Sequence, residues 1–289
     1  MATLAPDAPL RPAARRSWIR RHSAVPGFGV TLGVTLTLLS LIVLIPLAAV
    51  AIKAAELTPD AFARAAFSER AVDAYKLSFG ASLIGATINS VFGALTAWAL
   101  VRYRFPGREI INALVDLPFA LPTAVAGISL ATLYSRNGWI GGLLEPLGIK
   151  TAYNPTGVVI ALSFIGLPFV VRTIEPVLRD QSIEVEEAAA SLGANRFQTV
   201  FRIVAPALFP AWLTGFALAF ARAVGEYGSV IFIAGNKPYI SEIAPLLITI
   251  QLQQFDYAAA ASIAIVMLGV SFVMLLVING IQAWARRTD

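Results

Sequence analysis

The stretch YAAAASIAIVMLGVSFVMLLVINGIQAWA, residues 257–285, contains no charged side chain. A helix needs about 20 mainly apolar residues to cross the hydrocarbon core of a bilayer, so this segment predicts a membrane-spanning helix. The composition of the whole chain agrees, since 57% of its 289 residues are hydrophobic and only 13% are charged. Soluble domains carry about twice that share of charged residues. The sequence therefore indicates an all-α integral membrane protein.

Uncharged runs of spanning length occur in five further places. They cover residues 23–52, 77–101, 117–135, 151–171 and 203–236, the last interrupted by two charged residues. We therefore predict six transmembrane helices, centred near residues 41, 89, 124, 164, 221 and 270. Residues 243–255 form another apolar run, too short to span, which predicts an interfacial or re-entrant helix.

The Lys and Arg residues near the span ends predict the orientation of the chain. Fourteen of them lie in the N-terminal tail, the second and fourth connections and the C-terminus, whereas seven lie in the other connections. Because positive charge gathers on the cytoplasmic side, we expect both termini there. Residues 1–27 are then a basic cytoplasmic tail and residues 28–53 an uncleaved first transmembrane helix. Residues 75–284 form the remaining core.

Several classes of chemistry lack the residues that they need. The chain has no cysteine and one histidine, which leaves almost nothing for an intramembrane enzyme or a zinc site. The phosphate-binding pattern G-x-x-x-x-G-K-[ST] is absent, so we expect no cofactor on this chain and ATP–Mg only on a partner ATPase. Membrane topology explains the net charge of +5, and no nucleic-acid partner is expected.

The fourth connection, within residues 172–206, is patterned as two short helices. Ser182 is a predicted N-cap before an acidic first turn, Gly193 lies where a helix C-terminus favours glycine, and Asn195 can cap a second helix. We expect Pro206 to end that segment. An apolar stripe follows the second cap and consists of Phe197, Val200, Phe201 and Val204. Such a hairpin can dock a partner, lie on the membrane or pack on the protein's own helices.

The spacing of this connection resembles the EAA loop of ABC-importer permeases. The matching residues are Glu187, Ala188 and Ala189, then Gly193 after three residues, and then Ile203 and Pro206 after nine more. The family usually has leucine where this chain has Ala205, but the glycine spacing is intact. In that family the loop forms coupling helices that fit a cleft on the ATPase. The resemblance implies the same role for these six residues.

Five further segments are similar to permeases of sulfate and thiosulfate importers, and to the T-type rather than the W-type subunit. They are RYRFPGR (102–108), DLPFALPTAVAG (116–127), PFVVRT (168–173), ARAVGEYGSVIFIAGN (221–236) and QFDYAAA (254–260). The resemblance implies a type I importer permease in the bacterial inner membrane. Its partners would be a W-type sister permease, two ATP-binding subunits and a periplasmic sulfate-binding protein, with lipid around the spans. Molybdate or another oxyanion is the alternative substrate.

Polar residues inside the predicted spans are candidates for a translocation pathway or gate. Arg222 and Glu226 are four residues apart in the fifth span, where they form either a structural ion pair or a weak, compensated contact for a dianion. Pro122 and Thr123 break the third span. Asn89 lies in a stripe of small residues and is predicted to form an interhelical hydrogen bond or, alternatively, to line the pore. A stand-alone secondary transporter needs coupling carboxylates in mid-span, and only Glu226 clearly qualifies.

Overall fold

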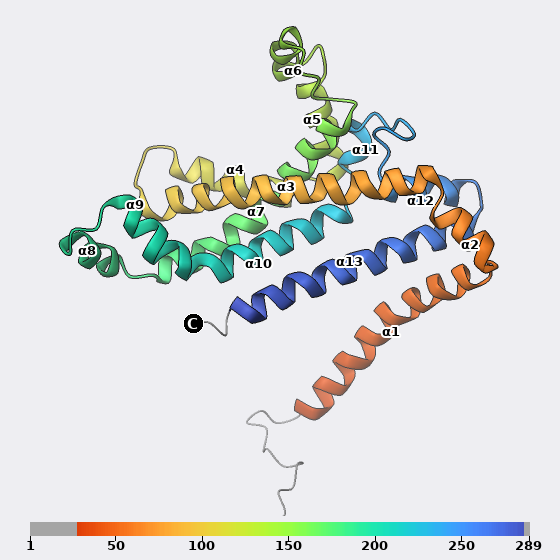
Figure 1. The fold of residues 1–289 in the computed structure, drawn as a ribbon, viewed down its shortest axis with the longest axis horizontal. Coiled ribbons are helices and arrows are strands. Elements are labelled where there is room, and N and C mark those ends of the chain that lie inside the picture. The colour runs from red at the N-terminus through yellow and green to blue at the C-terminus, as the bar shows by residue number, and fades with distance from the viewer. Residues whose placement is uncertain (1–27, 286–289) are drawn as a thin grey trace, which may run out of the picture. The chain divides into compact units, whose positions relative to one another are not determined.

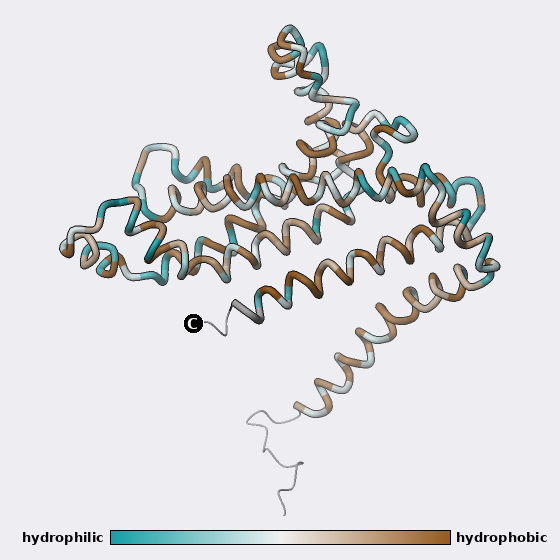
Figure 2. The backbone as a smooth tube through the Cα atoms, viewed as in Figure 1, coloured by the Kyte–Doolittle hydropathy of each residue, from teal (hydrophilic) through white to brown (hydrophobic). Residues whose placement is uncertain are grey.

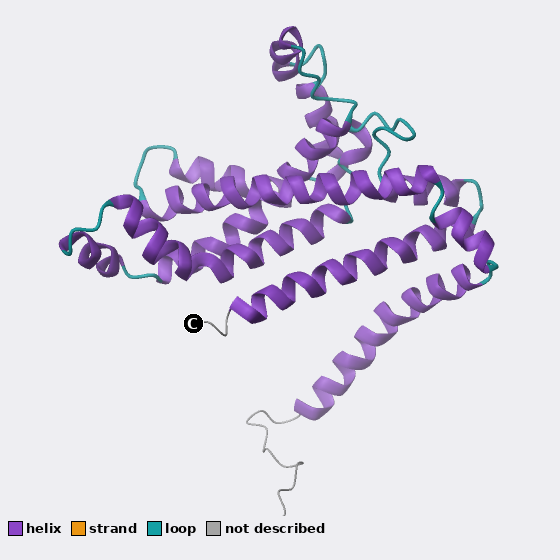
Figure 3. Cartoon of the chain, in the orientation of Figure 1, coloured by secondary structure: helices purple, strands orange, loops and turns teal. Residues whose placement is uncertain are grey.

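The computed structural model describes residues 28–285, which contain helices and loops but no strand (Figures 1 and 3). The chain divides into two units, one ending at Ala48 and the other beginning at Ala49. The described part of the first unit belongs to helix α1 (Phe28–Ala55). The predicted basic tail, residues 1–27, and Arg286 and Arg287 lie outside the described residues.

The second unit contains the other helices. Their bounds are α2 (Pro59–Ala66), α3 (Glu69–Arg102), α4 (Arg108–Ala120), α5 (Thr123–Tyr134), α6 (Trp139–Leu144), η1 (Glu145–Leu147), α7 (Pro155–Asp180), α8 (Ile183–Ser191), α9 (Arg196–Thr199), η2 (Val200–Val204), α10 (Ala205–Val224), α11 (Val230–Ile233), α12 (Ala244–Gln253) and α13 (Tyr257–Ala285). Helices α3, α7 and α10 pack on one another, and α13 packs on α10 and α12.

Small residues allow the central helices to approach closely. A Cβ atom on Gly93 of α3 would lie 2.8 Å from the Cβ of Val170 in α7, and one on Gly215 of α10 would lie 3.0 Å from the Cα of Val170. The predicted stripe on α3 is buried in this interface and consists of Ala81, Gly85, Asn89, Gly93 and Ala97. Close backbone packing of this kind replaces the hydrophobic driving force that membrane helices lack.

Five helical segments are long and apolar enough to span a membrane, and a sixth is a bent pair. The long helices are apolar along most of their length, as Figure 2 shows for α13. The bent pair consists of α4 and the segment Thr123–Leu147, and the bend between them is 117°. Pro122 explains the break, because a proline favours extended backbone at the preceding residue, and Leu121 has φ −86° and ψ 135°.

The bent pair carries the chain from one end of the second unit to the other. Arg102 at the end of α3 donates a hydrogen bond of 3.2 Å to the carbonyl of Gln181, just after α7. Helices α3 and α7 therefore end at the same end of the unit and run in the same direction. Between them the chain must return, and α4 and α5 provide that return. The pair thus counts as one crossing, in agreement with the predicted third span.

The fifth span differs from its prediction in two ways. Its helical segment covers Arg196–Val224 and is not centred near residue 221, because Gly225 ends α10. The prediction that Pro206 ends the preceding segment is also wrong. The π-helical turn η2 carries the helix past that proline, since the N–H of Ala205 bonds to the carbonyl of Val200, five residues earlier.

Candidate functional site: a helical hairpin and a buried turn

Two short helices at one end of the second unit form the predicted hairpin (Figure 1). The Ser182 hydroxyl accepts the N–H of Glu184 at 3.2 Å and caps α8. At its other end the N–H groups of Gly193 and Ala194 bond to the carbonyls of Ala190 and Ala189, each at 3.0 Å. This pairing is a Schellman motif, and it requires the positive φ of +86° at Gly193. The predicted N-cap and C-terminal glycine are confirmed.

The second helix of the hairpin begins with a reciprocal cap. The Asn195 side chain accepts the N–H of Gln198 at 2.8 Å, and the Gln198 side chain accepts the N–H of Asn195 at 2.9 Å. The predicted cap at Asn195 is therefore confirmed. The helices on either side extend into the predicted connection, since α7 continues to Asp180 and α9 begins at Arg196. Residues 172–206 therefore include the ends of two long helices as well as the hairpin.

The hairpin presents a surface that mixes carboxylates and exposed apolar side chains. Glu187, Ala188, Gly193 and Pro206 are exposed, Ile203 is half-buried and Ala189 is buried. The large apolar side chains exposed on the hairpin are Ile183, Val185, Leu192, Phe197 and Phe201. Leu192 is 89% exposed, so this surface does not pack on the protein's own helices. The predicted stripe divides, because Val204 is buried while Phe197 and Phe201 are exposed and contact each other with ring centroids 4.3 Å apart.

Arg102 anchors the hairpin to α3. This contact could not be predicted from the sequence. Its guanidinium lies 2.7 Å from the Glu186 carboxylate and also bonds to the Gln181 carbonyl. The arginine side chain is only 10% exposed and lies over the Trp98 ring. In the sequence Arg102 is one of the positive charges of the second connection, and no local pattern connects it with a glutamate 84 positions later. The hairpin is thus held by α3 as well as by α7.

Glu226 organises the turn between α10 and α11. Its side chain is 2% exposed and forms an ion pair with Arg222, which is 35% exposed. One carboxylate oxygen also accepts the N–H of Ser229 at 2.9 Å and its hydroxyl at 3.0 Å. The predicted ion pair is present, but it lies at the end of the fifth span rather than inside it. Among the described residues, no three His, Cys, Asp or Glu side chains could together hold a metal ion.

The start of α5 packs against this turn. A Cβ atom on Gly228 would lie 3.2 Å from the Cβ of Thr123, and one on Gly127 would lie 2.8 Å from the Cα of Ser229. Pro122 and Thr123, which break the third span, are therefore neighbours of the Glu226 turn. The start of α5, with Thr123, thus meets the turn that follows Glu226, although these two residues are about 100 positions apart in the chain.

Asn89 belongs to a different environment. It is 2% exposed and lies against Gly166 of α7, where a Cβ atom would collide with its amide nitrogen. That amide nitrogen has no hydrogen-bond partner within residues 28–285. The interhelical position predicted for Asn89 is confirmed, but its amide nitrogen does not form the predicted hydrogen bond.

Residues 89–288 match the family described as binding-protein-dependent transport system inner membrane component. The chain belongs to this family. The permease is also similar to proteins named sulfate transport system permease protein CysT. It is 50% identical to that of Synechocystis sp. over 88% of this chain and 89% of the relative. It is 46% identical to that of Escherichia coli over 92% of this chain and 96% of the relative.

Solved structures support the fold of the permease. A bacterial ABC transporter that imports the acidic polysaccharide alginate contains a similar chain, with a TM-score of 0.73 and 18% identity over 88% of the permease and 94% of that chain. The same kind of transporter in complex with its alginate-bound periplasmic protein gives a TM-score of 0.71 at 19% identity, over 87% and 92%. The permease is thus a multi-pass inner-membrane subunit of an ABC importer, which implies an ATPase and a binding protein as partners.

Proposed function

We propose that this permease is a translocation subunit of an ATP-driven importer of sulfate and thiosulfate. The observation that carries the proposal is the identity of 46–50% with sulfate permeases over most of both chains. Membership of the family accounts for the absence of a nucleotide-binding motif, because ATP hydrolysis is performed by another subunit. We assign ATP–Mg to that ATPase and no cofactor to this chain.

The hairpin is the surface proposed to meet the ATPase. Its contact residues are Glu187, Ala188, Ala189, Gly193, Ile203 and Pro206. The exposure of Leu192 and Phe197 supports this role, since apolar side chains outside the bilayer are costly unless a partner covers them. One permease offers one hairpin. An ATPase pair therefore implies a second permease, and we propose a heterodimer with a W-type sister, two ATP-binding subunits and a periplasmic sulfate-binding protein.

The turn around Glu226 is proposed as a gate or pathway element. The guanidinium of Arg222 is partly exposed, while its partner Glu226 is buried. An arginine can offer a dianion both charge and directed N–H donors, and a paired carboxylate weakens that attraction. Weak binding suits a conduit that must release its ion. Pro122 and Thr123 form the adjoining wall, and Asn89 lies deeper between the central helices.

Uptake of labelled sulfate tests the proposed function directly. A strain that lacks this chain is expected to lose uptake and to recover it when the permease is supplied with its sister, the ATPase and the binding protein. Omission of the sister permease is expected to leave uptake at background. Unlabelled thiosulfate should compete strongly and molybdate weakly. Strong competition by molybdate alone would instead make this a molybdate permease, and uptake without the sister would exclude the heterodimer.

The orientation of the chain is tested by reporter fusions after Ser68 and after Asn195. Three crossings lie between these positions, namely α3, the α4–α5 pair and α7. An odd number of crossings places them on opposite sides of the membrane. We expect a periplasmic reporter to be active after Ser68 and inactive after Asn195, which also places both termini in the cytoplasm. Activity of the same reporter at both positions would contradict this topology.

A further inference from the structure

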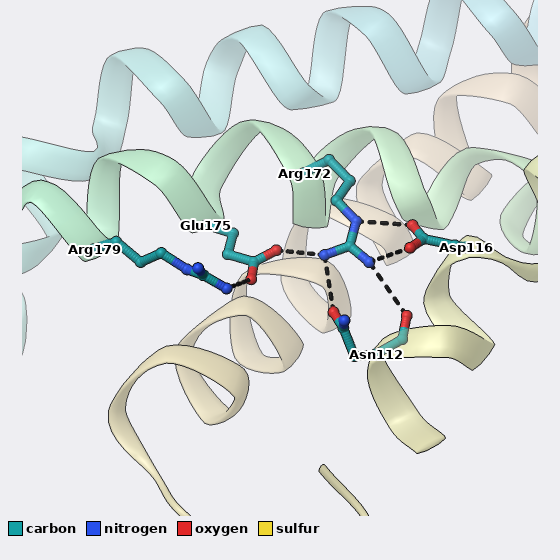
Figure 4. Close-up of polar contacts among 5 residues, drawn as sticks. All are labelled: Asn112, Asp116, Arg172, Glu175 and Arg179. Atoms are coloured by element: carbon teal, nitrogen blue, oxygen red, sulfur yellow. Dashed lines mark hydrogen bonds and ion pairs between the residues drawn. The ribbon is translucent and has the colours of Figure 1, made fainter. Parts of the chain in front are cut away.

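Arg172 of α7 is the centre of a polar network that reaches α4 (Figure 4). Its Nε donates to Asp116 at 2.8 Å, and one terminal nitrogen donates to the other Asp116 oxygen at 2.5 Å. The two terminal nitrogens also donate to the side chain and carbonyl of Asn112, at 2.9 and 3.2 Å. A further bond of 2.5 Å reaches Glu175, whose second oxygen pairs with Arg179.

This network uses the full hydrogen-bonding capacity of one guanidinium. An arginine has five N–H groups, and each of those on Arg172 has an acceptor. Two arginines face two carboxylates, so the cluster is neutral as a whole. Glu175 is 7% exposed and therefore depends on its arginines, whereas Arg179 is 58% exposed and touches only Glu175 within this cluster. Within this cluster, Arg172 is the side chain of α7 that contacts α4.

Helix α4 has few other attachments. Val115 is its one buried residue among those described, while Ile110, Leu114 and Phe119 are exposed. The central helices α3 and α7, in contrast, bury long stripes of small and apolar residues against each other. One aromatic contact adds to the polar network, an edge-on pair of Phe119 and Phe169 with centroids 5.1 Å apart. The position of α4 thus depends mainly on Arg172 and its acceptors.

The two helices joined by Arg172 lead to the two functional regions. Helix α7 ends at Asp180, and only Gln181 and Ser182 separate it from α8 of the hairpin. Helix α4 ends at the break before Thr123, which packs against the Glu226 turn. A displacement of the hairpin moves the end of α7, and a rigid link to α4 carries that displacement to the break. An unlinked α4 would remain where it is.

We infer that Arg172 is a positioning residue that links the motion of the hairpin to the broken span and, through it, to the Glu226 turn. This inference rests on the proposed function, because it assigns the hairpin to the ATPase. The acceptors Asn112 and Asp116 are the two points on α4 at which the link acts. They are four residues apart and so lie on one face of that helix.

The test compares Arg172→Gln with Arg179→Gln in vesicles that contain the whole transporter. We expect Arg172→Gln to keep the bound ATPase and its basal ATP hydrolysis. The sulfate transported per ATP should fall by about twofold to thirtyfold, the range in which residues along a coupling network act. Arg172→Lys should recover part of that loss, since an ammonium can still pair with Asp116 but has fewer donors. Arg179→Gln should transport as the unaltered protein does.

A second measurement does not depend on sulfate. The chain has no cysteine, so cysteines introduced at Ile110 on α4 and Ser191 on α8 can carry spin labels without background. We expect one narrow distance distribution in the full permease and a broadened one in Arg172→Gln. Unchanged distances, or equal loss of transport per ATP in both glutamine variants, would overturn the inference. Failure of the unaltered transporter to move sulfate would instead count against the proposed function and leave the distance result intact.

Discussion

Replacement of Gly193 with valine is expected to reduce ATP-driven uptake by at least about tenfold without lowering the amount of permease in the membrane. Gly193 has a φ of +86°, and a side chain there would meet no atom within 4 Å. The expected damage therefore comes from the backbone alone. A left-handed conformation costs a residue with a side chain about 1–2 kcal/mol, and a β-branched one more. Relief of that strain breaks the Schellman motif and displaces α8 from α9.

Gly148 provides a matched control for this prediction. Its φ is +76°, and a side chain there would also meet nothing within 4 Å, so Gly148→Val carries the same kind of strain. It lies outside the hairpin, so its local strain should leave ATPase binding and uptake close to normal. The measurements are co-purification of the ATPase and uptake in vesicles. Equal uptake by both valine variants would show that the hairpin does not couple the permease to the ATPase.

Removal of the positive charge at Arg222 is the second change with a large expected effect. In Arg222→Met the carboxylate of Glu226, which is 2% exposed, loses its cation. Breaking a buried pair costs about 3–5 kcal/mol, and we expect the lower end because Arg222 is partly exposed. The amount of folded permease should fall strongly, and uptake by more than about tenfold.

A double variant that removes both charges distinguishes a loss of folding from a loss of transport. In Arg222→Met with Glu226→Gln, the glutamine oxygen can still accept the N–H of Ser229, and no charge is left unpaired. We expect the folded amount to recover while uptake stays low, because the arginine proposed to contact the anion is gone. Recovery of uptake as well would make the pair purely structural.

The pair formed by Arg70 and Glu242 is the control for that experiment. The carboxylate of Glu242 is as deeply buried as that of Glu226, at 2% exposed, and it accepts two bonds of 2.7 Å from Arg70. This pair joins α3 to the loop before α12. Arg70→Met with Glu242→Gln should recover both the folded amount and the uptake. Loss of uptake in this control would show that any neutralised pair impairs transport.

Features that depend on residues close together in the chain can be predicted from the sequence of this permease. Uncharged runs located the long helices, because crossing a bilayer requires length and apolarity within a single segment. Ser182, Gly193 and Asn195 located the ends of the hairpin helices, because caps are bonds between residues two to five positions apart. The resemblance to the EAA loop could also be recognised from the sequence, because its residues lie within one short segment from Glu187 to Pro206.

The tertiary structure alone decided which distant residues meet. Arg102 lies against Glu186, Arg172 against Asp116, and Thr123 against Gly228, and nothing near any of them in the chain specifies its partner. It also decided that the fifth span ends before Glu226 and that η2 carries a helix past Pro206. Helix propensity predicts that a helix ends at a proline, whereas a π-helical turn can satisfy the hydrogen bonds of the backbone groups around it. Contacts across the fold therefore place the hairpin, the break and the buried turn relative to one another.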